Sequence, residues 1–198
     1  MSLMGPEKQA LRARIRAARA EIGEADRREA AIRVAAGALG LTGVVGARGA
    51  LAYFAMPEEL DPSPLVRTLS QAGTRIAYPR VCGPGALTLH WGDTCEPEPG
   101  YCGIMEPPAG SDEASLDEIG LVLVPGVAFD GDCRRLGMGG GFYDRLLAAL
   151  PPTTLKVALA FDEQIVDAVP CEDHDTVIDA VVTPTRVLRR GKPAAHRP

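Results

Sequence analysis

The sequence predicts an α/β protein: a single-domain, three-layer sandwich in which helices flank a mostly parallel, mixed sheet of the Rossmann-like kind. Runs with strand character alternate with runs of helical periodicity along the 198 residues. Residues 121–124 and 155–161 are mostly aliphatic, which is typical of parallel strands buried on both faces. The length suits one domain with one sizeable core.

The expected helices and strands follow one another along most of the chain. Residues 6–21 and 24–39 carry apolar side chains at helical spacing, with Pro6 in the first turn and Gly40 after the second helix. Residues 87–91 alternate apolar and polar side chains, as a strand at or near a sheet edge does. The other expected elements are strands over 47–54, 75–81 and 177–182, the last in the chain, and helices ending near residues 72 and 150.

Three segments are expected to lie outside this regular structure. Residues 1–4 look like an expression remnant and residues 189–198 like a polar, frayed tail, which leaves residues 5–188 as the domain. Residues 95–115 are rich in proline, glycine and acidic side chains and predict a long loop. Such a loop in a compact domain is usually functional or disordered.

Composition excludes several classes of function. The net charge of −5 argues against a general nucleic-acid binder. No apolar run is long enough to span a membrane, and the first residues lack the apolar core of a signal peptide. The five cysteines fit neither a zinc pattern nor a disulfide framework, so we expect free thiols in a reducing cytoplasm.

The strongest candidate site is a glycine loop (residues 137–141) between the strand at 121–124 and the helix at 142–150. Backbone N–H groups of such a loop approach an anion closely, and the helix dipole adds to the attraction. The loop fits neither G-x-G-x-x-G, because Phe142 occupies the third glycine position, nor G-K-[ST]. On spacing alone, a flexible turn beside solvated arginines is an equal alternative. The residues concerned are Arg134, Arg135, Gly137, Gly139, Gly140 and Gly141.

The residues around the glycine loop resemble a known signature. VPGVAFD at 124–130 and RLGMGGGFYDR at 135–145 are similar to the signature of the 5-formyltetrahydrofolate cyclo-ligase family, also called 5,10-methenyltetrahydrofolate synthetase. The resemblance implies an enzyme that uses ATP and Mg²⁺ to cyclise 5-formyltetrahydrofolate. One position departs from the family: Cys133 stands where glycine is usual, and Gly131 is expected to provide the turn instead.

The resemblance implies an ATP site at the glycine loop and the amino-terminal helix. The family begins with a K-x-x-x-R helix whose cations reach the nucleotide phosphates, and Lys8 and Arg12 match it. Spacing alone favours a solvated basic face made by Lys8, Arg12, Arg16 and Arg19. Arg135 is the expected catalytic residue, which neutralises charge on the transferring phosphoryl group. The other implied ATP-binding residues are Leu136, Gly137, Met138, Gly139, Gly140, Gly141, Phe142 and Tyr143.

A folate-binding wall is implied as well. Glu59 matches, by register, a glutamate that contacts the folate, with Phe54 and Met56 as apolar neighbours. From the residue type alone, an equally good explanation is that the carboxylate complements the N-terminus of the following helix. Tyr101 precedes GIMEP at 103–107, which resembles the family's folate-side segment. The residues implied to contact both ligands are Met138, Gly139, Gly140, Gly141 and Phe142.

Two aspartates are the implied Mg²⁺ ligands. Asp144 lies just inside the helix after the glycine loop, and Asp175 matches an aspartate of the family's carboxyl-terminal segment. Mg²⁺ favours a few carboxylates together with phosphate oxygens and waters. The alternative for Asp144 is that its charge complements the helix dipole. The alternative for Asp175 is that it lies in a solvated acidic loop, together with His174.

The chemistry that the resemblance implies begins with phosphorylation of the formyl oxygen by ATP, followed by ring closure through N10 and loss of phosphate. Such a reaction rests on positioning and charge neutralisation, which fits a sequence without a Ser-His-Asp or Cys-His constellation. A non-catalytic folate or nucleotide sensor and a small-molecule kinase stay as alternatives. We expect a monomer, with a dimer left open. Trp91 is expected in the core, and the alternative is that its ring stacks on a ring of the folate. The roles of Arg134 and Arg145 stay open, and one outcome for Arg145 is a side chain exposed to solvent.

Overall fold

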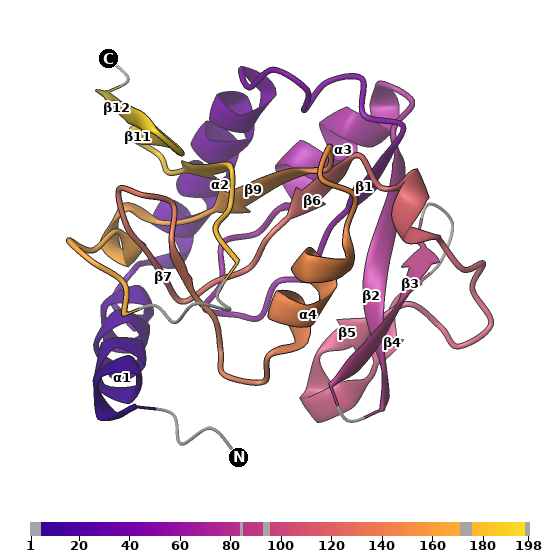
Figure 1. Cartoon of the computed structure of the whole chain (residues 1–198), viewed down its shortest axis with the longest axis horizontal. Helices are drawn as coiled ribbons and strands as arrows, with labels where there is room; N and C mark the ends of the chain where they lie inside the picture. The colour runs from indigo at the N-terminus through magenta and orange to yellow at the C-terminus, as the bar shows by residue number, and fades with distance from the viewer. Residues whose placement is uncertain (1–4, 84, 93–95, 171–175, 197–198) are drawn as a thin grey trace.

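The computed structural model describes residues 5–83, 85–92, 96–170 and 176–196. An eight-stranded sheet in the order β12-β11-β10-β9-β6-β1-β2-β3 forms its middle layer, with helices on both faces (Figure 1). The strands of this sheet are β1 (Gly49–Leu51), β2 (Arg75–Gly83), β3 (Ala86–Trp91), β6 (Leu121–Leu123), β9 (Leu155–Leu159), β10 (Ala180–Val182), β11 (Arg186–Arg189) and β12 (Lys192–His196).

The centre of the sheet is parallel and its edges are antiparallel. β1 pairs in parallel with β2 and β6, and β9 pairs in parallel with β6 and β10. β3 pairs antiparallel with β2 at one edge, and β11 and β12 continue antiparallel from β10 at the other. The predicted α/β fold with a mostly parallel, mixed sheet is therefore confirmed, including the edge position of the strand expected at 87–91.

Alternating side chains divide the core between the two faces of the sheet, as the period of two in a strand requires. Ala50 and Leu123 pack under α2 (Glu24–Leu39) and α3 (Ser63–Gln71). Leu51 and Val122 pack under α4 (Phe142–Ala149). These two clusters make the three layers of the sandwich. The residues of α2 and α3 involved are Ala30, Ala31, Val34, Ala35, Ala38, Leu65 and Leu69, and those of α4 are Leu146 and Leu147.

Helix α1 (Pro6–Ala20) lies beside a small hairpin and not on the main sheet (Figure 1). The hairpin consists of β7 (Ala128–Phe129) and β8 (Arg135–Leu136), and Ile15 of α1 packs against it. This hairpin corrects the expectation of a direct strand-to-helix glycine turn. The chain leaves β6, forms the hairpin, and only then enters the glycine loop and α4.

Two other segments contain more regular structure than the sequence indicated. The expected polar tail contributes β12, and β10 is not the last strand. Pairing at a sheet edge satisfies backbone groups whatever the side chains are, so polarity alone did not reveal it. The expected long loop contains β4 (Glu98–Pro99), the 3₁₀ turn η1 (Tyr101–Gly103) and β5 (Met105–Glu106), with β4 and β5 paired.

The hairpin turn between β7 and β8 is organised by a buried carboxylate. One oxygen of Asp130 accepts the N–H groups of Asp132 and Arg134, and the other accepts the N–H of Val169 at 3.0 Å. Cys133, fully buried, adopts the left-handed region with φ of 61°. The cysteine itself takes the backbone conformation that glycine usually provides, and the expectation that Gly131 would replace it is wrong.

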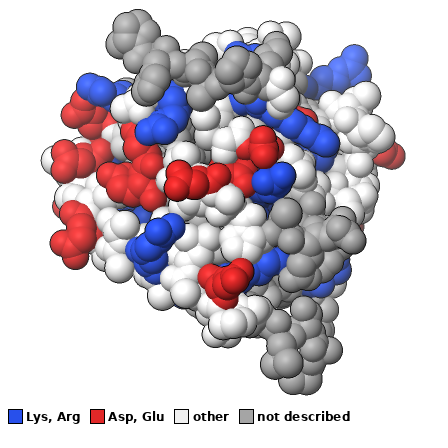
Figure 2. Space-filling model, turned by 60° about the vertical axis from the view of Figure 1, so that its left-hand side comes forward, with Lys and Arg blue, Asp and Glu red and all other residues white. Residues whose placement is uncertain are grey.

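Charged side chains are unevenly distributed over the surface. On the face shown in Figure 2, acidic side chains gather toward one side and basic side chains are scattered over the rest. In the described part of the chain, no helix has the length and apolarity that crossing a membrane requires.

Candidate active site

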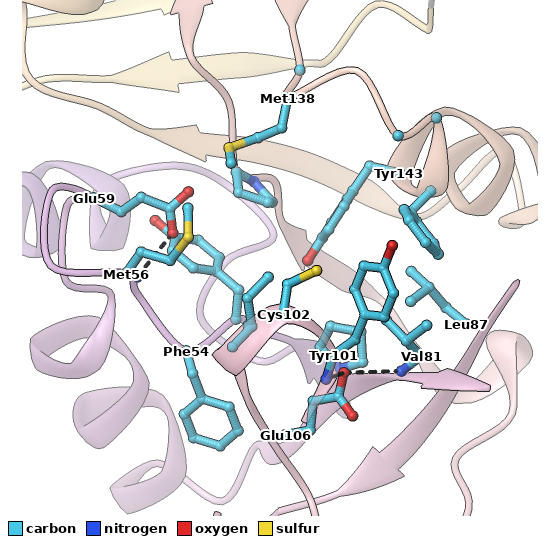
Figure 3. A pocket seen from close by; sticks show the side chains of 18 of the residues that line it. Phe54, Met56, Glu59, Val81, Leu87, Tyr101, Cys102, Glu106, Met138 and Tyr143 are labelled. Atoms are coloured by element: carbon cyan, nitrogen blue, oxygen red, sulfur yellow. Dashed lines mark hydrogen bonds between the residues drawn. The ribbon is translucent and has the colours of Figure 1, made fainter. Parts of the chain in front are cut away.

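A cavity of about 370 Å³ lies where the chain after β1, the β2–β3 hairpin, the η1–β5 segment and the glycine loop meet (Figure 3). Its surface is mostly apolar, with a few polar groups directed into it. Lining residues expected from the sequence are Phe54, Met56, Glu59, Tyr101, Arg135, Gly137, Met138, Gly139, Gly140, Gly141, Phe142, Tyr143 and Asp144. Ile104, Met105 and Glu106 also line it and belong to the GIMEP segment expected on the folate side. Lining residues not expected are Tyr53, Pro79, Val81, Leu87, Cys102 and Pro125.

The glycine loop presents backbone donors to the cavity. Among the described residues, the N–H groups of residues 138–141 have no acceptor. Gly139 and Gly141 have φ angles of 105° and 66°, which turn the chain into α4 and would strain any side chain there. Free N–H groups at the start of a helix form an anion-binding site.

Two arginines hold the carbonyl groups of the glycine loop. Arg12 Nε donates to the carbonyl of Gly137 at 2.8 Å. Arg145 Nη2 donates to the carbonyl of Gly140 at 3.0 Å. In a trans peptide the carbonyl and the following N–H point in opposite directions, so each bond turns the next N–H away from its arginine. The loop is thereby held with its donors available to a ligand.

Arg12 belongs to helix α1 and lies 125 positions before Gly137 in the sequence. Arg12 is only 8% exposed, and Arg16 Nη2 lies 3.9 Å from the sulfur of Met138. Arg19, on the same helix, is buried too. This part of the basic face is therefore packed against the protein, and the solvated face that spacing favoured is wrong for Arg12 and Arg19. Lys8 lies one turn before Arg12 on the same face of α1.

Arg135 and Asp144 meet at the wall of the cavity. Arg135 forms an ion pair through Nη2 with Oδ1 of Asp144, and its Nη1 donates to the carbonyl of Pro125 at 3.1 Å. The side chain of Arg135 is 3% exposed, whereas that of Asp144 is 32% exposed. The guanidinium is thereby held beside the glycine loop in a buried position, where it can face an anion with little screening from water.

Tyr143 directs an unpaired hydroxyl into the cavity (Figure 3). The oxygen is buried and has no hydrogen-bond partner among the described residues. Burial raises the pKa of Tyr143, and the negative charge of Glu59 raises it further. The phenol therefore stays protonated and is a hydrogen-bond donor for whatever occupies the cavity.

Glu59 stands on the opposite wall, after the carboxyl end of β1. Its Oε2 accepts the N–H of Met56 at 3.1 Å. Burial raises the pKa of Glu59, while the Met56 N–H and the positive charge of Arg19 partly offset that increase. Phe54, which also lines the cavity, stacks on Tyr78 with ring centroids 4.1 Å apart, so its ring is held in place from behind.

Glu106 lies in the GIMEP segment expected on the folate side, but its own role was not predicted from the sequence. Its Oε1 accepts the N–H groups of Tyr101 at 3.2 Å and Val81 at 3.3 Å (Figure 3). The side chain is 4% exposed, so these bonds fix the η1 turn against β2. Tyr101 then lies 6.0 Å from the ring of Phe142, centroid to centroid. Only the folded chain brings these partners together, although the acid is visible within GIMEP.

Several other predicted residues lie outside the cavity. Leu136 packs in the cluster between α1 and the hairpin and does not line the cavity. Trp91 is buried, with the guanidinium of Arg75 3.8 Å from its ring centroid, so its core role is confirmed. Arg134 pairs with Asp132 at 3.2 Å, outside the cavity. Asp175 and His174 lie outside the described residues.

The residues beside the glycine loop fit a Mg²⁺–phosphate complex better than a metal site made by the protein alone. No cluster of three or more His, Cys, Asp or Glu side chains suits a metal within the described residues. Asp144 lines the cavity, and only one of its oxygens has a partner in that part of the chain. Mg²⁺ commonly takes one or two carboxylates and completes its shell with phosphate oxygens and waters.

A doubly covered α/β sheet, an anion-binding loop at a helix start and an adjoining, mostly apolar cavity place the protein among α/β proteins that bind a phosphate-bearing ligand beside an apolar pocket. Comparison with known proteins identifies the class further. The model of the 5-formyltetrahydrofolate cyclo-ligase family matches residues 4–184. The chain belongs to that family, whose named members are ligases.

Curated relatives and solved structures agree with this assignment. A 5-formyltetrahydrofolate cyclo-ligase from Escherichia coli is 37% identical over 73% of this chain and 82% of its own. A 5-formyltetrahydrofolate cyclo-ligase from Mycolicibacterium smegmatis is 33% identical over 72% of this chain and 76% of its own. The solved structure of 5,10-methenyltetrahydrofolate synthetase from Aquifex aeolicus is similar with a TM-score of 0.81 and 28% identity, and the match covers 96% of each chain.

Proposed function

We propose that this protein cyclises 5-formyltetrahydrofolate to 5,10-methenyltetrahydrofolate at the expense of ATP, with Mg²⁺, and releases ADP and phosphate. The observation that carries the proposal is that a surface suited to phosphate and a surface suited to a pterin line one cavity. The free N–H groups of residues 138–141 suit a phosphate chain, and they line the same cavity as the aromatic residues that suit a pterin.

The reaction has two covalent steps. The formyl oxygen attacks the γ-phosphorus of ATP, and the bond from that phosphorus to the bridging oxygen breaks to release ADP. N10 of the same substrate then attacks the formyl carbon and loses its proton, and the carbon–oxygen bond breaks to release inorganic phosphate. The first step converts a poor leaving oxygen into phosphate, and the second closes the ring.

The named residues contribute position and charge. The glycine loop holds the phosphates, with Lys8 and Arg12 of α1 adding positive charge, and Arg135 neutralises charge on the transferring group. Asp144, together with Asp175, would hold Mg²⁺, which when bound shields the charge of the phosphate oxygens.

On the folate side, Glu59 accepts hydrogen bonds from the pterin, and Phe54 and Met56 provide apolar contact. Tyr101 and Phe142 close the cavity beside the glycine loop. We place the protein in the cytoplasm as a monomer, with a dimer as the alternative, and the free thiols of Cys82, Cys102 and Cys133 are compatible with a reducing compartment.

One assay separates this function from its alternatives. Purified protein is mixed with ATP, Mg²⁺ and 5-formyltetrahydrofolate, and the absorbance of the methenyl product is followed, with each component omitted in turn. The proposal requires product only in the complete mixture. Binding without turnover would identify a sensor, and a stable phosphorylated product would identify a kinase.

A further inference from the structure

Arg145 connects two walls of the cavity. Its side chain leaves the first turn of α4, and its Nε donates to the carbonyl of Gly85 at 2.8 Å. Its Nη2 donates to the carbonyl of Gly140 in the glycine loop at 3.0 Å. Gly85 lies in the turn between β2 and β3, 60 positions away in the sequence. An arginine with an exposed side chain thus joins two backbone segments that would otherwise be independent.

The backbone at both contacts is shaped for this guanidinium. Gly85 has φ of 72°, and a Cβ there would lie 2.2 Å from Arg145 Nη2. Gly141 has φ of 66°, and a Cβ there would lie 3.0 Å from Arg145 Nη1. The ring of Phe142 supports the guanidinium at 5.7 Å from its centroid. Two glycines therefore leave the space in which the planar, five-donor head of arginine reaches both carbonyls.

The contact with Gly140 controls the direction of a ligand-facing donor. Since the Gly140 carbonyl and the Gly141 N–H belong to one planar peptide, fixing the carbonyl also fixes the N–H. That N–H is one of the donors without an acceptor among the described residues. Arg145 thus acts on the anion site through the backbone, without needing to touch the ligand.

The contact with Gly85 extends this control to the other wall. The β2–β3 hairpin that Gly85 joins lines the cavity through Val81 and Leu87. A shift of the glycine loop therefore pulls on the hairpin, and a shift of the hairpin pulls on the loop. Two sites joined in this way influence each other's affinity, and the influence is reciprocal.

We infer that Arg145 is a positioning residue that orients the Gly140–Gly141 peptide for phosphate and couples the nucleotide side of the cavity to the folate side. The inference rests on the proposed function. It assigns to Arg145 a role in the binding of both substrates, although the side chain does not line the cavity.

The test compares variants that break the bridge from either end. Arg145→Ala removes both contacts, and Arg145→Lys keeps the charge but loses the fork that reaches two carbonyls. Gly85→Ala places a Cβ against the guanidinium while leaving Arg145 intact. Arg28→Ala is the matched control, because Arg28 is an exposed arginine on α2 that pairs with Glu24. For each variant, KM for both substrates and kcat are measured, together with the Kd of a non-hydrolysable ATP analogue with and without 5-formyltetrahydrofolate.

Loss of a charge-assisted hydrogen bond predicts that Arg145→Ala raises KM for ATP about tenfold, with a smaller rise for the folate and a lesser change in kcat. The effect of each ligand on the Kd of the other should shrink toward none. Arg145→Lys should give intermediate values, and Gly85→Ala should have little further effect in the Arg145→Ala background. Values for Arg145→Ala that match those of Arg28→Ala would overturn the inference. A wild-type protein without methenyl product would instead overturn the proposed function.

Discussion

Arg135 and Asp144 form an ion pair at the wall of the cavity, Nη2 to Oδ1, with the arginine almost fully buried and the aspartate partly exposed. The sequence assigned these residues separate tasks, charge neutralisation and metal binding. Their pairing fixes the guanidinium beside the glycine loop and leaves one carboxylate oxygen of Asp144 without a partner among the described residues. Removal of either residue therefore changes the environment of the other.

Replacement of Arg135 by alanine should lower kcat by about 10²–10³, the usual effect of removing a group that stabilises developing charge. Steady-state kinetics at saturating ATP and folate measure it, and circular dichroism checks the fold. Arg134→Ala is the matched control, since Arg134 pairs with Asp132 and does not line the cavity. Equal kcat values for the two variants would show that the charge of Arg135 has no catalytic role.

Glu59 should give folate binding a dependence on pH. Because burial raises the pKa of Glu59, the carboxylate takes up its proton at a higher pH than an exposed glutamate does. The negative form accepts the pterin donors, so KM for the folate should rise as pH is lowered from about 7 toward 5. Glu59→Gln should show a high KM throughout and no acidic rise. The neighbouring Glu58→Gln should keep the acidic rise but begin it at a lower pH, because the charge of Glu58 contributes to the raised pKa of Glu59. An unchanged profile in Glu59→Gln would refute the assignment.

Tyr143→Phe should change stability and activity in opposite directions. The buried hydroxyl has no partner in the described part of the chain, and removing an unsatisfied group of this kind should raise the free energy of unfolding by about 1 kcal/mol. The bound ligand loses a donor, so kcat/KM for ATP, the ligand to which Tyr143 is assigned, should fall about tenfold. Urea denaturation and steady-state kinetics provide the two values.

Tyr53→Phe is the control for stability. Its hydroxyl donates to the carbonyl of Leu60 at 3.0 Å, so the variant should be less stable than the wild type. A Tyr143→Phe protein that is both less stable and fully active would contradict the prediction on both counts.

Cys133 should make the protein sensitive to alkali. Burial raises the pKa of the Cys133 thiol from 9.0 to about 11. The unfolded chain ionises first as pH rises, so the stabilisation is complete below about pH 9 and is lost toward pH 11, up to about 3 kcal/mol. Urea denaturation at both ends of that range should show a smaller loss in Cys133→Ala. An equal loss in the variant would exclude the thiol as the cause.

Native thiol labelling checks the same residue independently. Cys82 and Cys102 are exposed and Cys133 is buried. Below pH 9 a maleimide should modify the first two rapidly, and Cys133 only after denaturation. Mass spectrometry of peptides from the labelled protein distinguishes the positions.

Local patterns predicted the elements whose burial is regular. The helix expected at 24–39 agrees with α2, because its small apolar side chains recur at helical spacing against the sheet. β6 and β9 were recognisable because central parallel strands, covered on both faces, are mostly aliphatic. The sequence did not reveal β4, β5 and β12, because these segments are strands through pairing with a neighbouring strand and not through a pattern in their own side chains.

The sequence by itself determined the alternation of strands and helices, the glycine loop with its neighbouring arginines, and through its signature the family of the protein. Tertiary structure alone decided that Arg12 and Arg145 hold loop carbonyls, and that Glu106 fixes η1 to β2. Periodicity records how each residue is buried within its own element. Contacts across 125 or 60 positions depend on the order in which the strands assemble, which brings those distant segments to one cavity.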